Sequence, residues 1–228
     1  MPRIYKLSRT GVKLLYKIRH HRGHGIHSPF VFNLVTKVIE EKSPYHAYQD
    51  IKDALEGKSY KYYRVNKYNL LAFRLVNYFE SRNILEIGSG YGLNTLCLTA
   101  HSSKVNCTCV ETSLSKYSLA QNLYEDWGRN IKLYTDLSLP DLEEKQDCIY
   151  IDLSNYNHMP EDFISYLVSL CTEKTFIIVK GIRTNKRNQA LWKSIKDIKS
   201  RTAVLDLFNL GIVFFDTKLY RWKYQISF

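Results

Sequence analysis

The stretch NILEIGSGYG, residues 83–92, constrains the fold of this chain more than any other. Its first five residues, 83–87, are mostly apolar, as in a buried strand. Three glycines then occupy every second position, beginning at Gly88. Glycine tolerates backbone conformations that other residues avoid, and it allows another group to approach the backbone where a Cβ would clash. The pattern therefore predicts a strand that runs into a tight loop lying against a ligand.

From residue 83 onward, short apolar runs alternate with stretches of helical periodicity. The expected strands are residues 83–88, 104–111, 130–136, 147–153, 175–181 and 201–208. The expected helical stretches are 92–102, 113–128, 139–145, 159–173 and 187–200. This alternation favours parallel βα units with helices on both faces of the sheet. Residues 207–228 hold further strands separated only by turns, so we expect the last strands to pair antiparallel.

The predicted fold class is α/β: a Rossmann-like, doubly wound, mostly parallel seven-stranded sheet with an antiparallel C-terminal edge. Residues 66–228 form this domain in the prediction, and residues 1–65 form a basic, helical N-terminal extension. Three helices are expected, within residues 27–42, 43–57 and 59–81. Ser28 fits the N-cap of the first helix and Pro29 its first turn.

The chain carries a net charge of +11, and much of its positive charge lies near the N-terminus. Eight Lys and Arg residues precede the first acid, Glu40. Such a segment can meet nucleic acid, an anionic membrane or an acidic partner, or it can simply aid solubility. The chain shows no secretory signal and no apolar run approaching the ~20 residues of a membrane span, so we expect a cytoplasmic protein. The sequence is compatible with a homodimer but does not determine the oligomeric state.

The five cysteines favour free, buried thiols in a reducing compartment. Cys107 and Cys109 lie two residues apart in an expected strand, which is neither a zinc-binding spacing nor a disulfide framework. The histidines at positions 20, 21, 24 and 27 are loosely spaced among glycines and cations, which disfavours a metal site there as well.

Three kinds of ligand compete for the glycine loop. A triphosphate-binding loop needs a lysine after its last glycine, and none follows Gly92. A dinucleotide fingerprint needs a further glycine where this chain has Leu93. S-adenosylmethionine carries an ammonium group and no pyrophosphate, so the acid Glu86 can attract it directly or through water. Glu111, which closes the next expected strand, can accept from both ribose hydroxyls, and Asp136 can receive the adenine amino group. The candidate cofactor-binding residues are Glu86, Gly88, Ser89, Gly90, Glu111, Thr112, Asp136 and Asp152.

These residues resemble a known motif. The segment ILEIGSGYGLNTL, residues 84–96, is similar to the glycine loop of class I S-adenosylmethionine-dependent methyltransferases. The resemblance covers residues 83 to about 216 and is nearest to the catechol-type O-methyltransferase branch. Within it, HGIHSPF (24–30) and DLFNLGIVFF (206–215) resemble stretches of a bacterial set of methyltransferases. The resemblance implies this fold, this cofactor and the same roles for the glycines and acids of the loop.

The catechol-type branch also implies a divalent metal held by an Asp at the end of the fourth strand and an acidic pair after the fifth. Asp152 matches the first ligand, but Lys180 and Gly181 stand where the pair should be, and Asn155 stands where the pattern often has His. A lysine ammonium group cannot ligate a hard cation, and glycine has no side chain, so we expect no metal site. The departure concerns the chemistry and leaves the fold expectation unchanged.

Asp152, Lys180 and His158 are the candidate catalytic residues. Lys180 can replace the missing positive charge or stabilise an oxyanion, or it can form a plain salt bridge with Asp152 in a site that has lost activity. His158 is a candidate base. We further expect the HGIHSPF stretch to cover the cofactor cleft.

The sequence thus favours methyl transfer from S-adenosylmethionine to a small-molecule acceptor without a metal. One alternative is a nucleic-acid methyltransferase that uses the basic N-terminus, although the Asn-Pro-Pro-Tyr type of motif is absent from DLSNYN, residues 152–157. Another is a degenerate protein that binds the cofactor without turnover.

Overall fold

A computed structural model describes residues 28–59, 61–156 and 158–228, and the structural statements below refer to them. The basic segment 1–27, with its histidines, lies outside the described residues, so the expectations for it are not addressed by the structure.

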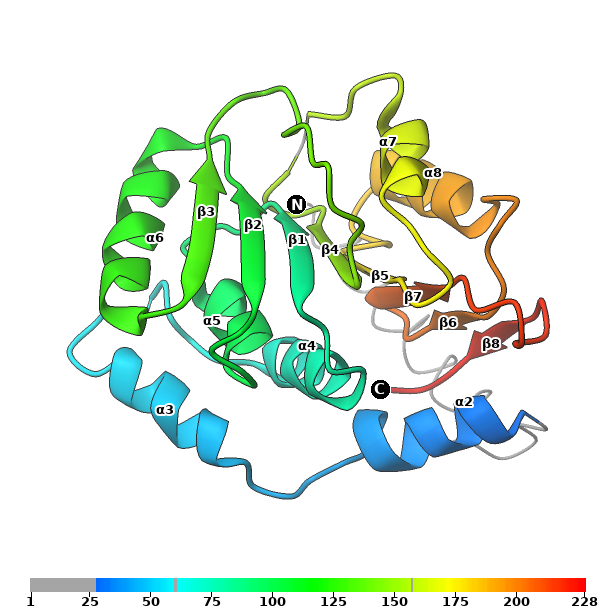
Figure 1. The fold of residues 1–228 in the computed structure, drawn as a ribbon, viewed down its shortest axis with the longest axis horizontal. Helices are drawn as coiled ribbons and strands as arrows, with labels where there is room; N and C mark the ends of the chain where they lie inside the picture. The colour runs from blue at the N-terminus through cyan, green and yellow to red at the C-terminus, as the bar shows by residue number, and fades with distance from the viewer. Residues whose placement is uncertain (1–27, 60, 157) are drawn as a thin grey trace, which may run out of the picture.

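One sheet of eight strands forms the centre of the molecule, in the order β3-β2-β1-β4-β5-β7-β6-β8 (Figure 1). The strands are β1 (Asn83–Ile87), β2 (Asn106–Val110), β3 (Asn130–Tyr134), β4 (Cys148–Asp152), β5 (Phe176–Lys180), β6 (Val204–Asp206), β7 (Leu210–Phe214) and β8 (Lys223–Gln225). The first five are parallel to one another, and β7 is antiparallel to both β5 and β6. The predicted α/β class, with its antiparallel C-terminal edge, is confirmed.

The last strand differs from the prediction in two ways. β8 is an eighth strand where seven were expected, and it runs parallel to β6, not antiparallel. The reason lies in the connection. β7 ends at Phe214, which lies beside the first residues of β6. The segment 215–222 then passes the first residues of β6, and β8 begins on the other side of that strand. A strand that starts next to the start of β6 must run in the same direction.

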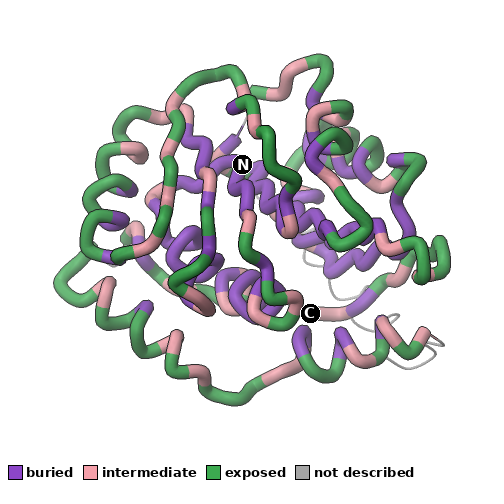
Figure 2. The backbone as a smooth tube through the Cα atoms, viewed as in Figure 1, coloured by how far each residue is buried: buried purple, intermediate pink, exposed green. Residues whose placement is uncertain are grey.

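Helices cover both faces of the sheet. They are α2 (Pro29–Leu34), the π-helix η1 (Val35–Ile39), α3 (His46–Ala54), α4 (Lys67–Tyr78), α5 (Leu93–Thr99), α6 (Leu114–Trp127), α7 (Phe163–Ser169) and α8 (Lys186–Lys196). Apolar residues of α7 and α8 pack with alternate residues of the central strands on one face. The other face packs against α2, η1, α4, α5 and α6. The central strands are accordingly buried along their length, whereas β3 at the edge is not (Figure 2).

The N-terminal helices share the sheet's core. The Ser28 side chain accepts from the Val31 N–H and Pro29 lies in the first turn, which confirms the predicted start of the first helix. Val31 and Leu34 are fully buried in one cluster with residues of α4 and the strands. This packing does not by itself test a boundary at residues 65 and 66, which stays a prediction.

Phe30, the last residue of HGIHSPF, lies at the wrong end of the sheet for a lid. Its ring packs edge-on against Phe214, 5.2 Å between centroids, and Phe214 pairs with Phe176, the first residue of β5. The glycine loop follows the last residue of β1, so it lies at the opposite, carboxyl edge of the parallel strands. For Ser28–Phe30 the expected cover over the cofactor cleft is therefore wrong, and residues 24–27 lie outside the described part of the chain.

The predicted helix at 139–145 is also wrong. No helix lies between β3 and β4 in the structure, where residues 135–147 form an irregular connection. Pro140 has no N–H to donate, and the stretch is too short to be stabilised as a helix except by tertiary packing. Leu139 and Leu142 instead pack against the core of the α7–α8 face. The connection leaves one face of β3 exposed at the sheet edge.

Candidate active site

The glycine loop follows β1 and requires glycine for two reasons. Gly88, Gly90 and Gly92 have φ values of 83°, 63° and 88°, in the left-handed region that other residues rarely adopt. The loop is also closely approached from the segment after β4. A Cβ on Gly88 would lie 2.8 Å from the Asp152 carbonyl oxygen, and one on Gly90 would lie 2.7 Å from the Asn155 Nδ2. The groups that approach the bare backbone of this loop belong to the protein itself, and the predicted approach of a ligand stays a prediction.

Glu111 follows β2 directly and is fully buried. Its Oε2 accepts from the Gly90 N–H at 2.7 Å, and its Oε1 accepts from the Ser113 N–H at 2.8 Å. Burial raises the pKa of the Glu111 carboxyl, and these two N–H groups oppose the shift. A carboxylate oxygen has two acceptor positions, so each oxygen retains one for a further donor. The acid expected to meet the ribose thus lies in direct contact with the glycine loop.

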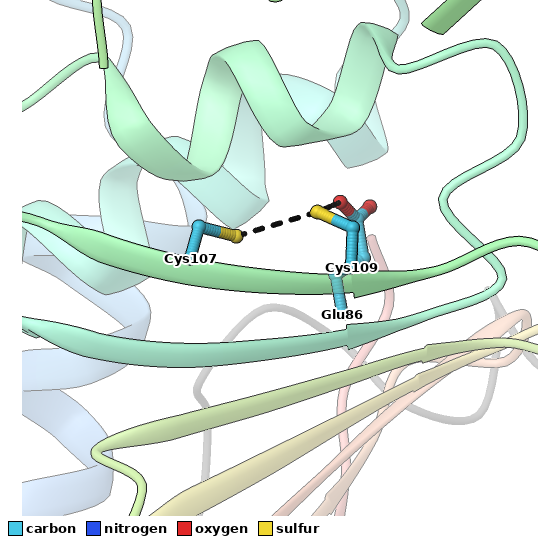
Figure 3. Close-up of side chains that lie close together, drawn as sticks. All are labelled: Glu86, Cys107 and Cys109. Atoms are coloured by element: carbon cyan, nitrogen blue, oxygen red, sulfur yellow. Dashed lines mark hydrogen bonds between the residues drawn. The ribbon is translucent and has the colours of Figure 1, made fainter. Parts of the chain in front are cut away.

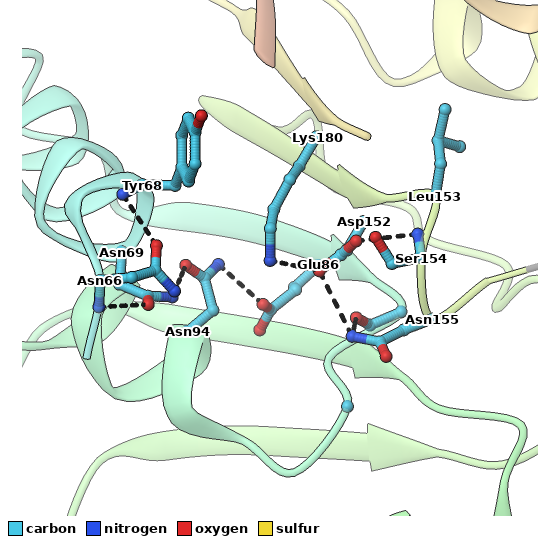
Figure 4. Close-up of polar contacts among 12 residues, drawn as sticks. Asn66, Tyr68, Asn69, Glu86, Asn94, Asp152, Leu153, Ser154, Asn155 and Lys180 are labelled. Atoms are coloured by element: carbon cyan, nitrogen blue, oxygen red, sulfur yellow. Dashed lines mark hydrogen bonds and ion pairs between the residues drawn. The ribbon is translucent and has the colours of Figure 1, made fainter. Parts of the chain in front are cut away.

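Glu86 is fully buried and hydrogen-bonded to the helix that follows the loop. Its Oε1 accepts from Asn94 Nδ2 at 2.9 Å (Figure 4). Its Oε2 accepts from Thr95 Oγ1 at 2.5 Å. Asn94 Oδ1 in turn accepts from Asn69 Nδ2 of α4. Burial raises the pKa of Glu86 to about 7, and the two side-chain donors moderate that shift. The carboxyl group therefore ties β1 to α5 and α4; its predicted attraction for an ammonium group stays a prediction.

Two thiols of β2 lie beside Glu86 of β1 (Figure 3). Cys109 Sγ is 3.7 Å from Glu86 Oε2 and 3.6 Å from Cys107 Sγ. In the described part of the chain, these three residues are the one group of three whose ligand atoms could surround a metal ion. Burial raises the pKa of the Cys109 thiol well above its usual value, which favours the protonated form over the thiolate that a metal needs. The arrangement is that of hydrogen-bonded core thiols, and all five cysteines are free.

Asp152 and Lys180 are adjacent at the carboxyl edge, as predicted. They are register partners on β4 and β5, and Lys180 Nζ lies 2.8 Å from Asp152 Oδ2. The Asp152 side chain is 7% exposed and the Lys180 side chain 26%. Asp152 Oδ1 also accepts from the Ser154 N–H at 2.9 Å. Each oxygen of the Asp152 carboxylate thus accepts a hydrogen bond, and the Lys180 side chain remains partly exposed.

Asn155 bridges the loops after β1 and β4. Its Nδ2 donates to the Gly88 carbonyl oxygen at 3.2 Å and lies 3.3 Å from Asp152 Oδ2 (Figure 4). Its Oδ1 accepts from Lys116 Nζ of α6 at 3.0 Å. From the sequence, Asn155 was expected only at the position of the His of the metal-dependent branch, and Lys116 was not expected at the site. No local pattern distinguishes Lys116 from other lysines of an amphipathic helix.

The remaining candidates lie in three different surroundings. Ser89 is buried within the glycine loop, and its Oγ has no hydrogen-bond partner among the described residues. Thr112 is half-buried beside Glu111. Asp136 and His158 are exposed in the loops after β3 and β4, and no hydrogen bond or ion pair joins either one to the glycine loop in the described ranges. Among the described residues, contacts therefore connect the loop with Glu111 and Asp152, and Asp152 with Lys180, whereas Asp136 and His158 make no such contact with the loop.

Several solved structures with a similar fold are methyltransferases. The O-methyltransferase of Bacillus cereus in complex with S-adenosylhomocysteine superposes with a TM-score of 0.56 at 20% identity, covering 81% of this chain and 97% of that one. An S-adenosylhomocysteine-bound methyltransferase of Podospora anserina gives 0.54 at 13% identity, covering 83% and 97%. The O-methyltransferase TomG of Streptomyces achromogenes, in complex with S-adenosylmethionine, gives 0.51 at 14% identity, covering 81% and 94%. No family model and no curated protein sequence matches the chain.

The chain therefore has the Rossmann-like fold of these S-adenosylmethionine-dependent methyltransferases. At these identities the similarity is one of fold, and the site must be judged from its own residues. No helix in the described part of the chain is both long and apolar enough to span a membrane.

Proposed function

We propose that this protein transfers a methyl group from S-adenosylmethionine to a small-molecule acceptor, without a metal ion. The contact between Glu111 and the Gly90 N–H carries the proposal. It joins the acid that closes β2 to the glycine loop that closes β1, at the carboxyl edge where open α/β sheets bind their ligands. The neighbouring folds, several with this cofactor or its product, support the same assignment.

The residues at this edge fit the cofactor. Glu111 keeps one acceptor position on each oxygen for the two ribose hydroxyls. Ser89 Oγ, buried in the loop, offers a hydrogen-bonding group without a partner in the described residues. The Asn155 side chain lies against Gly90, in the space a ligand of the loop would use, so it must rotate away on binding. In this proposal Glu86 acts by holding α5 beneath the loop and, through water, on the ammonium group. Thr112 and Asp136 complete the nucleoside contacts.

When bound, S-adenosylmethionine supplies an electrophilic methyl group on a sulfonium. The protein must then place the acceptor atom in line and favour its negatively charged form. Lys180 is suited to this task because its side chain is partly exposed, while its partner Asp152 holds the ammonium group in place. Both oxygens of Asp152 already accept hydrogen bonds, so its role in this proposal is to position Lys180. His158, exposed in the loop after β4, is the candidate to take the acceptor proton.

The Lys180–Asp152 pair also supports chemistry without a metal. A cation already occupies the position beside the Asp152 carboxylate, and Gly181 offers no side-chain ligand. Lys180 then supplies the positive charge that a divalent ion provides in the catechol-type branch. O-methyltransferases among the structural neighbours favour an oxygen acceptor, which an ammonium group can stabilise as an oxyanion.

A second candidate function is cofactor binding without turnover. The Asn155–Lys116 bridge and the Lys180–Asp152 ion pair leave the edge of the sheet internally satisfied, as in a protein that binds the cofactor but has lost turnover. Incubating the protein with methyl-labelled S-adenosylmethionine and pooled phenols, carboxylic acids and amines separates the two. Label transferred to one class establishes turnover, whereas binding without transfer to any pool favours the degenerate protein.

Calorimetric titration with S-adenosylhomocysteine tests the cofactor assignment. We expect binding by the unaltered protein and a loss of about tenfold or more in Glu111→Gln, because hydrogen bonds to a charged group contribute about 1.5–3 kcal/mol. The matched control is Glu125→Gln, an exposed acid of α6 whose substitution should leave affinity unchanged. Circular dichroism verifies that both variants fold. An unaltered protein that gives no binding heat at millimolar ligand would overturn the proposal.

A further inference from the structure

The strand at one end of the sheet order, β8, carries a surface that we call the basic–aromatic edge. It consists of Lys193, Lys196, Tyr220, Arg221, Trp222 and Lys223. Tyr220 is 83% exposed and Trp222 is 64% exposed, the former in the connection before β8 and the latter directly before the strand. Large aromatic side chains exposed to this extent at one place are an unusual use of surface in a folded protein.

Basic side chains surround these two rings. Lys223 of β8 lies 3.2 Å from Asp197, which ends α8, and Lys193 and Lys196 of that helix act on the same carboxylate. Burial lowers the pKa of the Lys196 ammonium; Asp206 opposes this shift, and the charge of Lys223 adds to it. Burial and the charge of Arg221 likewise lower the pKa of the neighbouring Arg201. Four cations therefore lie at this edge, with Asp197 paired to Lys223 among them, and a polyanion can neutralise their mutual repulsion.

We propose that the basic–aromatic edge binds single-stranded nucleic acid. Cations can track the phosphates of a flexible strand while exposed aromatic rings stack on successive bases, and stacking needs no particular sequence. Tyr220 and Trp222 are two residues apart with Arg221 between them, so stacking and phosphate contacts alternate along the chain. The edge lies at β8, at the other end of the sheet order from the β1–β2 glycine loop. The two sites are therefore independent, and either can exist without the other.

Two other occupants fit the edge less well. A membrane surface needs a broad apolar face to insert, but Leu219 packs against the core and Ile226 is buried, so this segment exposes two aromatic rings and no aliphatic face beside them. A second copy of the chain could pair along the β8 edge, but it would bring the cations of one copy against those of the other. Charge complementarity and stacking both favour a nucleic-acid strand.

Fluorescence anisotropy of labelled twelve-nucleotide oligouridine and oligothymidine, titrated with the full-length protein at several salt concentrations, tests the proposal. We expect binding to weaken with salt and to be tighter than to a duplex of the same length. Trp222→Ala and Tyr220→Ala should each weaken binding about tenfold without changing the salt dependence, because they remove stacking and no charge. Lys223→Ala should also lower the slope of log affinity against log salt by about 0.7, the value for one phosphate contact on a single strand.

The matched controls are Tyr134→Ala and Lys132→Ala on β3, an exposed aromatic and an exposed cation at the other edge of the sheet. They should leave both affinity and salt slope unchanged. The proposal is overturned by absence of oligonucleotide binding, or by equal binding of the Trp222, Tyr220 and Lys223 variants, which would place the contact elsewhere. It is also overturned if phosphatidylserine vesicles bind and oligonucleotides neither bind nor compete. Self-association that Trp222→Ala abolishes, in the absence of oligonucleotide binding, would assign the edge to a second copy.

Discussion

At the scale of single residues, the buried carboxyl of Glu86 shapes the pH dependence of stability. Its pKa in the folded protein is about 7, raised chiefly by burial from an ordinary value of 4.5. The folded state therefore binds more protons than the unfolded state between these two values, and stability falls as pH rises through that window. A difference of 2.5 pKa units corresponds to about 3 kcal/mol, lost in full above pH 7.

Glu86→Gln should remove this dependence. An amide keeps the shape of the side chain and can still accept from Thr95 Oγ1, but it does not ionise. We expect the variant to match the unaltered protein near pH 5 and to exceed its unfolding free energy by as much as about 3 kcal/mol at pH 8. Urea denaturation at pH 5, 6, 7 and 8 measures this difference. Parallel profiles for the two proteins would mean that the Glu86 carboxyl ionises as readily in the folded state as in the unfolded state.

Asn155 offers a second prediction, which concerns access to the glycine loop. Its side chain lies beside Gly90 and is held by the Gly88 carbonyl oxygen and by Lys116 Nζ. A ligand of the loop must break these hydrogen bonds, each of net strength about 1 kcal/mol. Asn155→Ala should therefore bind S-adenosylhomocysteine about tenfold more tightly, with calorimetry as the measurement. Asn122→Ala, an exposed residue of α6, is the control. Weaker binding by Asn155→Ala would instead make Asn155 a ligand of the nucleoside.

At the scale of helices and strands, the sequence predicted the elements that local pattern determines. β1, β4 and β5 read as continuous apolar runs because both of their faces are buried, and the glycines after β1 are required by backbone conformation. A helix was wrongly predicted at 139–145 because Leu139, Leu142 and the charged residues after them have the spacing of an amphipathic helix. Strands were expected within residues 207–228, but the direction of β8 was predicted wrongly because it depends on where β7 ends, which no local pattern shows.

The contacts of the candidate site were only partly predictable for a related reason. Glu111 and Asp152 end strands, so their position at the carboxyl edge follows from the fold. The partners of Glu86 on α5, and the bridge from Lys116 to Asn155, depend on side-chain geometry between elements far apart in the chain. Polar residues on a helix have many uses, so their identity alone does not reveal such contacts. A sequence pattern can therefore predict where a site lies, but it does not predict which side chains contact one another there.

At the scale of the whole molecule, the core determines what part of the chain can fold by itself. Five side chains of α2 and η1 are buried in one cluster with α4 and the sheet: Val31, Leu34, Val35, Val38 and Ile39. Burying each contributes about 2 kcal/mol, so together they contribute about 10 kcal/mol. That is comparable to the entire stability of an ordinary domain. Arg74 of α4 adds to this interface, since its Nε donates to the Val38 carbonyl oxygen at 2.6 Å.

A truncation series follows from this packing. A chain that begins at residue 28 keeps every described contact and should unfold cooperatively in urea. A chain that begins at residue 66 loses the five buried side chains and uncovers the apolar faces of α4 and the sheet, so it should lack a cooperative transition and bind an apolar dye. Denaturation followed by circular dichroism, with dye fluorescence, measures both. A cooperative transition in the shorter chain would make residues 66–228 a domain in their own right, because the sheet would then be stable without the helices that cover it.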